Sequence, residues 1–277
     1  MASLLSEWSR MAEGMGSLTN NGALWTYEDH IIAFNLYCQL PFGRLHQTNP
    51  KIIELADLLG RTPDSVAMKL CNFASLDPSL QKRGIRGLKS ASKGVEQVWG
   101  EFGREPERLA FESECLLANR LGRPVEQVSG VEVRDLPPPG TERDAIVRVR
   151  VNQRFFRRRI ISAFEFRCCV TGLAVPDLLV ASHIVPWASD AANRLNPRNG
   201  LCLNALHDRA FDRGLMWIEE GFIVRFSPRL SASRTGDKEG FAWLTRYDGH
   251  HLRLPRKFTP DPDLLRRHRD SVAVASV

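Results

Sequence analysis

Apolar residues recur at helical spacing in the first third of the chain. Ile31, Phe34 and Tyr37 lie three residues apart, and an N-cap residue followed by acidic residues precedes them. Two further helical stretches follow, each opened by a proline at its first position, and Gly60 ends the earlier of the two. The pattern predicts a helical domain over residues 21–104.

Helix, glycine-containing turn and helix form the layout of helix-turn-helix and Myb-like DNA-binding units. The stretch LWTYED…ELADLLGRTPDSVAMKLCNF resembles a Myb/SANT-like module, including a tryptophan at the start of its first helix. The resemblance implies a DNA reader whose third helix presents Asp64, Ser65, Lys69 and Asn72 outward, with Lys69 and Asn72 as candidate DNA contacts. A helical bundle that makes only protein contacts fits the same pattern.

The sequence pattern changes between the helical domain and the C-terminal part of the chain. Residues 105–140 are predicted to form a helical connector that ends in a linker at Leu136–Gly140, because three consecutive prolines hold a chain extended. The following domain, residues 141–277, opens with Ile146–Val151, where apolar and charged residues alternate with the period of a half-exposed strand. These patterns predict an α+β fold, with a helical domain followed by a mixed one.

An arginine-rich helix is predicted after this strand. Phe156 and Ile160 share its apolar face, and the arginines on the other face are Arg154, Arg157 and Arg158. A basic face of this kind neutralises phosphates without reading sequence. A solvated charged face explains the same pattern, so the stretch alone does not decide between the two.

Composition narrows the class of protein. Lys and Arg number 38 against 32 Asp and Glu, and this net charge of +6 suits a polyanionic partner. No apolar run reaches the roughly 18 residues of a membrane-spanning helix, and the N-terminal segment lacks the features of a secretion signal. We therefore expect no membrane association and a cytoplasmic location. The six cysteines include no Cys-x-x-Cys pair, so we expect no structural zinc.

The residues best suited to catalysis gather in one segment. His183 follows a short apolar strand, Asn199 stands sixteen residues later before a second strand, and His207 opens a helix eight residues further on. Two of the seven histidines thus lie in a compact strand–loop–strand–helix unit. An imidazole near its ordinary pKa of about 6.5 can accept a proton from water at neutral pH.

This order resembles the HNH nucleases, whose ββα-metal core places His, Asn and His in that sequence. The resemblance is closer to a subgroup with the motifs Cys-x-x-Thr-Gly, Ser-His-Ile-x-Pro, Asn-Gly-Leu and His-x-x-x-Phe-Asp-x-Gly, all of which are present. It covers roughly residues 147–270. It implies a C-terminal ββα-metal domain and metal-dependent hydrolysis of phosphodiester bonds.

The resemblance also implies roles for the three motif residues. His183 would be the general base, and His207 would be a metal ligand at the start of the helix. Asn199 would hold the loop between the strands and orient His183 through main-chain hydrogen bonds, and an approach of its side chain to the metal is a further possible role. One divalent ion, Mg²⁺ or Mn²⁺, would bridge the phosphate and stabilise the leaving oxygen.

Ser182 departs from the family pattern. Many HNH sites have an acidic residue or a histidine at this position as a metal ligand, and a serine hydroxyl is a poor substitute. Asp212, Asp208 or a water could complete the set, and we favour Asp212 because it belongs to the Phe-Asp-x-Gly motif. The expected metal residues are therefore His207, Asp212 and Ser182. Anchoring of the helix is the alternative role of Asp212.

The expected function is that of an endonuclease acting on double-stranded DNA. Arg194, Arg198 and Arg209, near the core, are further candidate DNA contacts. An HNH domain joined to a reader domain resembles restriction enzymes, which implies a role in defence, with 5-methylcytosine or 5-hydroxymethylcytosine in DNA as candidate targets. One HNH site cuts one strand at a time, so a double-strand break requires a homodimer or two successive events. The alternatives are a ligand-activated effector nuclease and a DNA-binding regulator that has lost catalysis.

Overall fold

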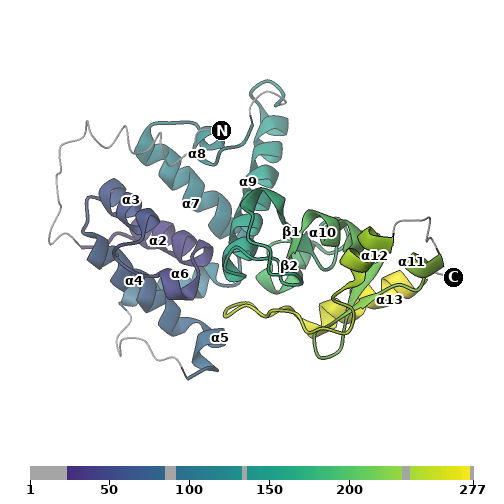
Figure 1. Ribbon diagram of the computed structural model, residues 1–277. Helices are drawn as coiled ribbons and strands as arrows, with labels where there is room; N and C mark the ends of the chain where they lie inside the picture. Colours follow the sequence, from purple (N-terminus) through teal and green to yellow (C-terminus); the bar gives the residue numbers. More distant parts are fainter. Residues whose placement is uncertain (1–23, 85–91, 133–135, 233–237, 275–277) are drawn as a thin grey trace. The chain divides into compact units, whose positions relative to one another are not determined.

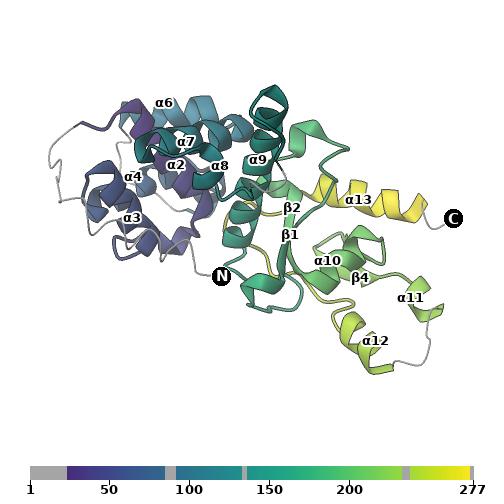
Figure 2. The same ribbon diagram turned by 90° about the horizontal axis from the view of Figure 1, so that it is seen from above.

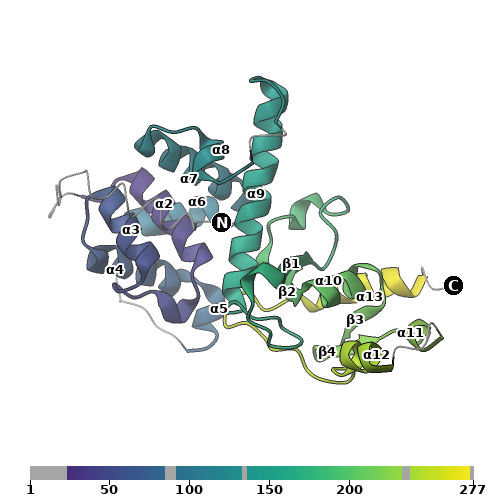
Figure 3. The same ribbon diagram turned by 45° about the horizontal axis from the view of Figure 1, so that its top comes forward.

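The computed structural model describes residues 24–84, 92–132, 136–232 and 238–274 (Figure 1). The chain divides into two compact units, and the division falls between Asn152 and Gln153. This division lies inside α9 (Thr141–Ala163), a single helix of 23 residues that Figure 3 shows as uninterrupted. Each unit has its own core.

The N-terminal unit is helical. Its helices before α9 are α2 (Tyr27–Gln39), α3 (Pro50–Leu59), α4 (Pro63–Leu76), α5 (Pro78–Gln81), α6 (Lys93–Phe102), α7 (Pro106–Leu121) and α8 (Val125–Val128). Helix α2 is central and packs against α4, α6 and α7. It begins with a capping box between Thr26 and Asp29, and the buried Asp29 carboxylate also pairs with Arg61 at 2.8 Å and Arg120 at 2.5 Å. These two pairs tie α2 to the loop before α4 and to α7.

Helix α4 presents only part of the outward face that we predicted, with Asp64 exposed and Ser65 partly exposed. Asn72 is only 7% exposed, because α4 packs against both α2 and α6, so its expected outward position is wrong. Lys69 is half-buried, with Nζ 4.9 Å from the ring centroid of Trp25, and it donates to Ser92 Oγ at 3.3 Å. Burial, and then the charge of Arg61, lower the pKa of Lys69. The Myb-like nature of this unit stays a prediction.

The strand predicted at Ile146–Val151 is wrong, because these residues belong to α9. The alternating pattern also places Val147 and Val151 four residues apart, which is one helical turn. Both are buried in a cluster with Val131. Acidic residues in the first turn of α9 stabilise the positive end of the helix dipole. Packing of one helical face thus outweighs the strand preference of β-branched residues.

The C-terminal unit contains a ββα arrangement, seen in Figure 2 with both strands beside α10. Its strands are β1 (Leu179–His183) and β2 (Gly200–Asn204), and α10 (Ala205–Asp212) follows directly. The strands are antiparallel, and His183 pairs with Gly200 in their register. Both predicted strands and the predicted helix are present. The loop between the strands spans residues 184–199 and contains two short 3₁₀ turns, η3 (Ala191–Asn193) and η4 (Pro197–Asn199).

A second antiparallel hairpin and three helices complete this unit. They are β3 (Met216–Glu219), β4 (Ile223–Phe226), α11 (Arg229–Ala232), α12 (Lys238–Thr245) and α13 (Pro262–Val274). Helix α13 packs against β3 and stacks His268 on Phe211 of α10, with 3.7 Å between the ring centroids. Helix α13 therefore supports the ββα unit through its contacts with α10 and β3. Of the helices described, none has the length and apolar character needed to cross a bilayer.

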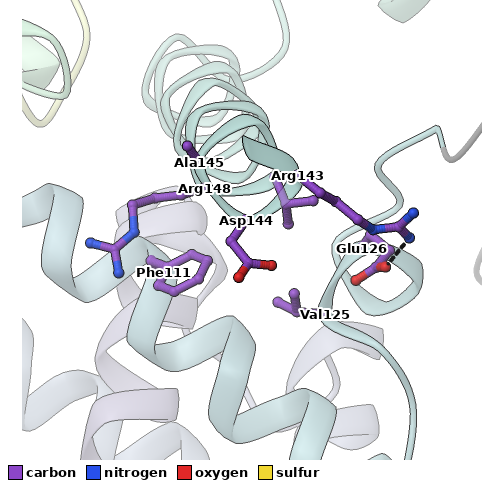
Figure 4. A pocket seen from close by; sticks show the side chains of 8 residues that line it. Phe111, Val125, Glu126, Arg143, Asp144, Ala145 and Arg148 are labelled. Carbon is purple, nitrogen blue, oxygen red and sulfur yellow. Dashed lines mark hydrogen bonds and ion pairs between the residues drawn. The ribbon is translucent and has the colours of Figure 1, made fainter. Parts of the chain in front are cut away.

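A cavity of about 390 Å³ lies within the N-terminal unit. Its walls come from α7, α8 and the first turns of α9. Arg143 pairs with Glu126 at 2.5 Å, and the guanidinium of Arg148 lies 4.3 Å from the ring centroid of Phe111. The carboxylate of Asp144 points into the space between these groups (Figure 4). The cavity thus combines an aromatic wall with charges of both signs.

Candidate active site

His183 stands at the end of β1 with a defined orientation. Its Nε2 lies 2.9 Å from the main-chain carbonyl oxygen of Arg194. Because a carbonyl can only accept, Nε2 carries the hydrogen, and the lone pair of the neutral ring is on Nδ1. The fold therefore leaves one nitrogen of this imidazole able to accept a proton.

Two aromatic rings enclose the imidazole of His183. Phe156 of α9 stacks on it with 3.8 Å between the ring centroids, and Trp187 meets it edge-on at 5.7 Å. Burial lowers the pKa of His183, whereas the Arg194 carbonyl and the charge of Asp212 act to raise it. The lowered pKa favours the neutral imidazole at neutral pH, which is the form that a general base requires.

Gly200 allows α9 to approach the strands this closely. A Cβ atom at this position would lie 2.9 Å from Cζ of Phe156 and would also collide with Ile160. The backbone of Gly200 is extended, so only the lack of space demands a glycine. The glycine at this position therefore has a steric role, because it allows Phe156 to pack against His183.

Asn199 is completely buried and ties the loop at residues 184–199 together. Its Oδ1 accepts from the Val185 amide at 2.8 Å. Its Nδ2 donates at 3.0 Å to the carbonyls of both Val185 and Asn193. The main-chain carbonyl of Asn199 accepts from the Ile184 amide. These hydrogen bonds to main-chain groups hold the loop directly after His183.

Two carboxylates lie on the same face of α10, because Asp208 and Asp212 are one helical turn apart. Burial raises the pKa of Asp208, and the charge of Asp212 raises it further, whereas Ser182 and Arg209 lower it. Burial also raises the pKa of Asp212, while nearby arginines and His183 lower it. Helix α10 packs against β1, and its carboxylates interact electrostatically with Ser182 and His183 at the end of that strand, so these four residues form one cluster.

The cluster fits a divalent cation that shares its coordination with substrate and water. Mg²⁺ is commonly bound through one or two carboxylates together with waters and phosphate oxygens. Asp208 and Asp212 supply such a pair, and a cation would offset the burial and the charge of Asp212, which together raise the pKa of Asp208. The Ser182 hydroxyl is buried beside them and completes no well-formed hydrogen bond with a described residue. In the described part of the chain, no three His, Cys, Asp or Glu residues are grouped to hold a metal.

His207 has a different environment from these carboxylates. It is completely buried, and its Nδ1 and main-chain amide both contact Asn204 Oδ1 at 3.0 Å. Its ring lies among Phe226, Trp243 and Tyr247, with centroids 5.6 to 6.3 Å away. Its Nε2 is buried and completes no hydrogen bond within the described residues. Burial lowers the pKa of His207, and the Leu244 main chain opposes this. Its role as a metal ligand stays a prediction.

The predicted DNA-contacting arginines differ in how strongly they are already engaged. Arg198 pairs with Asp261 at 3.2 Å and donates to the Thr259 carbonyl at 3.3 Å. Arg157 and Arg209 are exposed. The half-buried members of the set are Arg154 and Arg158. Arg157, Arg198 and Arg209 are therefore all accessible to a partner, and Arg198 is already engaged with Asp261.

The cysteines of the Cys-x-x-Thr-Gly turn and of β2 are buried. Cys168 accepts a weak hydrogen bond from the Thr171 amide, and Cys169 and Cys202 lie close enough to influence one another. Burial raises the pKa of Cys202 to about 12. Cys169 and Cys202 therefore stay protonated, and all three side chains fill space in the core, as small apolar residues do.

Sequence reasoning missed two contributors to the site and undervalued a third. It assigned Phe156 only to the core, although the ring stacks on His183. It considered only the side chain of Arg194, as a phosphate contact, because a main-chain carbonyl leaves no trace in the side-chain pattern. It ranked Asp208 below Asp212, although the one-turn spacing in a helix capped by Asn204 was a usable signal.

The comparison with known families agrees with this geometry. Residues 168–219 match the model of the HNH endonuclease family. The matched segment begins at the Cys-x-x-Thr-Gly turn and includes β1, β2, α10 and β3. No curated protein that was compared with the chain matches it. The match supports nuclease chemistry, and thus a nucleic acid substrate, for the ββα segment, which makes up the smaller part of the chain.

Proposed function

We propose that this protein is a metal-dependent endonuclease that hydrolyses phosphodiester bonds in double-stranded DNA. One observation carries the proposal. A neutral His183, oriented through Nε2, lies in one cluster with the carboxylates of Asp208 and Asp212, within a segment similar to HNH endonucleases. This arrangement brings together a proton acceptor and a pair of cation-binding oxygens.

In the proposed mechanism, His183 accepts through Nδ1 a proton from the water that attacks the phosphorus. The Arg194 carbonyl holds the opposite nitrogen, and Asp212 stabilises the imidazolium that forms, because its charge raises the pKa of His183. Asp208 and Asp212 would hold Mg²⁺ or Mn²⁺, which when bound neutralises charge on the phosphate and on the leaving oxygen. Ser182 lies beside these carboxylates, whereas His207, enclosed by aromatic rings, is the predicted ligand that this proposal leaves out.

Plasmid cleavage tests the proposal directly. With Mg²⁺ or Mn²⁺ present, the protein should nick or cut supercoiled DNA, and EDTA should stop the reaction. Removal of a general base typically costs about 10²–10⁴-fold in rate, so we expect a loss of this size in His183→Ala. The matched control is His250→Ala, because His250 is exposed. No cutting by the unaltered protein, or equal cutting by His183→Ala, would refute the proposal and favour a non-catalytic DNA-binding protein.

The proposed biological role is restriction of foreign DNA, with the helical N-terminal unit selecting the target. The presence of a second compact unit, separate from the one that contains the ββα segment, supports this division of roles. Cleavage of matched unmodified, 5-methylcytosine and 5-hydroxymethylcytosine DNA tests dependence on modification, and equal cutting of all three would refute it. Sedimentation of the DNA complex would show whether two copies assemble for a double-strand break.

The cavity in the N-terminal unit favours ligand activation as a second candidate function. Its volume of about 390 Å³ is in the range of small-molecule sites, which are roughly 300–1,000 Å³. Arg148 lies over Phe111, and the Asp144 carboxylate points into the cavity. A ligand that activates cleavage should raise the melting temperature of the protein, and Asp144→Ala should weaken both effects. Full cleavage activity of the purified protein without any added ligand would count against this candidate.

A further inference from the structure

We infer that Asp190 and Arg267 form a positioning pair for His183. Neither residue belongs to the cluster of Ser182, His183, Asp208 and Asp212. The kinetic part of the inference rests on the proposed nuclease function, whereas its structural part does not.

The orientation of His183 depends on a main-chain atom. Its Nε2–H donates to the Arg194 carbonyl, and only the conformation of the loop at residues 184–199 can place that carbonyl. The side chain of Arg194 helps, because its Nε donates to the Trp187 carbonyl at 3.0 Å across the loop. Residues that hold this loop in place therefore also determine that Nε2 is the nitrogen of His183 that carries the hydrogen.

The loop is held from inside by Asn199 and from outside by Asp190. Asn199 donates to the carbonyl of Asn193, the residue before Arg194. The side chain of Asn193 donates to Asp190 Oδ2 at 2.9 Å. The same oxygen accepts from Nη1 of Arg267 at 2.7 Å. One carboxylate oxygen thus joins the turn before Arg194 to helix α13.

Arg267 projects from a firmly seated helix. The next residue, His268, is buried, stacks on Phe211 of α10 and donates from Nε2 to the Phe211 carbonyl at 3.2 Å. The Asp190 side chain is 13% exposed and that of Arg267 is 52% exposed, so the pair is partly shielded from solvent. Arg267 and Asn193 both lower the pKa of Asp190, which keeps the carboxylate charged. The loop is therefore tied to α13, and α13 is held through His268 against α10, the helix that carries Asp208 and Asp212.

Loss of this pair should loosen the Arg194 carbonyl without removing any group that contacts substrate. The imidazole of His183 would then spend less time with Nδ1 as the acceptor. We therefore expect kcat to fall while KM stays unchanged, because positioning of the base matters in the transition state. Misplacement of a catalytic group by about 1 Å can cost roughly 100-fold in rate, so we expect a loss of about 10- to 100-fold.

The neighbouring arginine on α13 provides a matched control. Arg266 has a similarly exposed side chain, and its ion pair with Asp263 stays within the helix. We expect Arg267→Gln and Asp190→Asn to lower kcat, Arg267→Lys to recover part of the loss, and Arg266→Gln to leave kcat unchanged. An unchanged kcat in both Arg267→Gln and Asp190→Asn would overturn the inference, and so would an equal loss in Arg266→Gln.

A second measurement does not depend on cleavage. Nitrogen-15 NMR under mildly alkaline conditions reports which imidazole nitrogen of His183 carries the hydrogen. The Nε2–H form should dominate in the unaltered protein and in Arg266→Gln, and the Nδ1–H form should grow in Arg267→Gln. An unaltered tautomer ratio in Arg267→Gln would overturn the inference. If the protein cuts no DNA, the proposed function fails, while this measurement still decides for or against the positioning pair.

Discussion

The carboxylates of Asp208 and Asp212 are the residues on which the proposed metal dependence rests. Each is partly buried, and each has a raised pKa for that reason. A half-buried carboxylate pair is costly without a cation, so the site is suited to bind one as part of its working state. Because both pKa values are raised, acidification should weaken cation binding at a higher pH than for ordinary carboxyl groups.

Replacement of Asp212 by Asn tests this at the level of one residue. Asp212→Asn keeps the shape of the side chain and removes one charged ligand. We expect the Mn²⁺ concentration for half-maximal cleavage to rise by more than the roughly 10–100-fold that even outer partners of metal sites contribute. Asp263→Asn, on the exposed start of α13, is the control. An unchanged Mn²⁺ requirement in Asp212→Asn would exclude this carboxylate as a ligand.

Asn199 makes a separate prediction about stability. Asn199→Ala would leave the amide and carbonyl of Val185 and the carbonyl of Asn193 without their partner. At about 1 kcal/mol for each of three buried hydrogen bonds, the free energy of unfolding should fall by about 3 kcal/mol. Urea denaturation measures this loss. Asn199→Asp should also destabilise the protein, because a carboxylate cannot donate to either carbonyl, and full stability of both variants would contradict the bonding scheme.

At the scale of elements, α13 acts as a brace whose strength should depend on pH. Burial lowers the pKa of His268 from its ordinary value of 6.5 to about 4, while its hydrogen bond to the Phe211 carbonyl opposes this. Between about pH 6.5 and pH 4, His268 is protonated in the unfolded chain but stays neutral in the folded protein. The stability that depends on neutral His268 is therefore complete above pH 6.5 and falls as the pH drops toward 4.

His268→Gln should flatten this dependence. A lowering of pKa from 6.5 to about 4 corresponds to about 3 kcal/mol of unfolding free energy, lost between these two pH values. The variant lacks the titrating group, so its stability should change less across this window, although loss of the ring stack lowers its stability at neutral pH. Urea denaturation at several pH values would compare the slopes, and equal slopes would show that His268 is not responsible.

Helices and strands whose sequence patterns lie within the element itself could be predicted from the sequence, whereas the first half of α9 could not. The strands and helix around His183 and Asn199 were predicted because caps, apolar runs and motif spacings all lie within them. The first half of α9 was predicted as a strand, since its alternation of apolar and charged residues fits both periods. Its packing against Val131 favours the helix, and this packing joins segments that are separate in the sequence.

At the scale of the whole chain, what could not be predicted depends on residues far apart in sequence. The aromatic surroundings of His207 come from Phe226, Trp243 and Tyr247, in β4, in α12 and beyond α12. The Asp190–Arg267 pair joins residues 77 positions apart. Neither arrangement has a motif or a period, so only the folded structure shows it.

The net charge of +6 leads to a prediction about DNA binding. Arg157 is exposed on α9, whereas Arg225 is already paired with Glu219 at 2.7 Å. Each phosphate contact contributes about one unit to the slope of log affinity against log salt concentration. Arg157→Gln should therefore reduce this slope by about one, and Arg225→Gln should leave it unchanged. Fluorescence anisotropy at several salt concentrations measures both, and equal slopes for all forms would remove Arg157 from the DNA-binding surface.

The close contact between Gly200 and α9 affects how the results of a mutational scan of this protein should be interpreted. Because any Cβ at Gly200 collides with Ile160 and approaches Phe156 Cζ to 2.9 Å, substitutions there should be as poorly tolerated as those at His183. A scan scored by DNA cleavage alone would therefore rank Gly200 among the catalytic positions. A second score for the abundance of each variant would distinguish the two positions. Gly200→Ala should lower the amount of folded protein, whereas His183→Ala should lower only the cleavage activity.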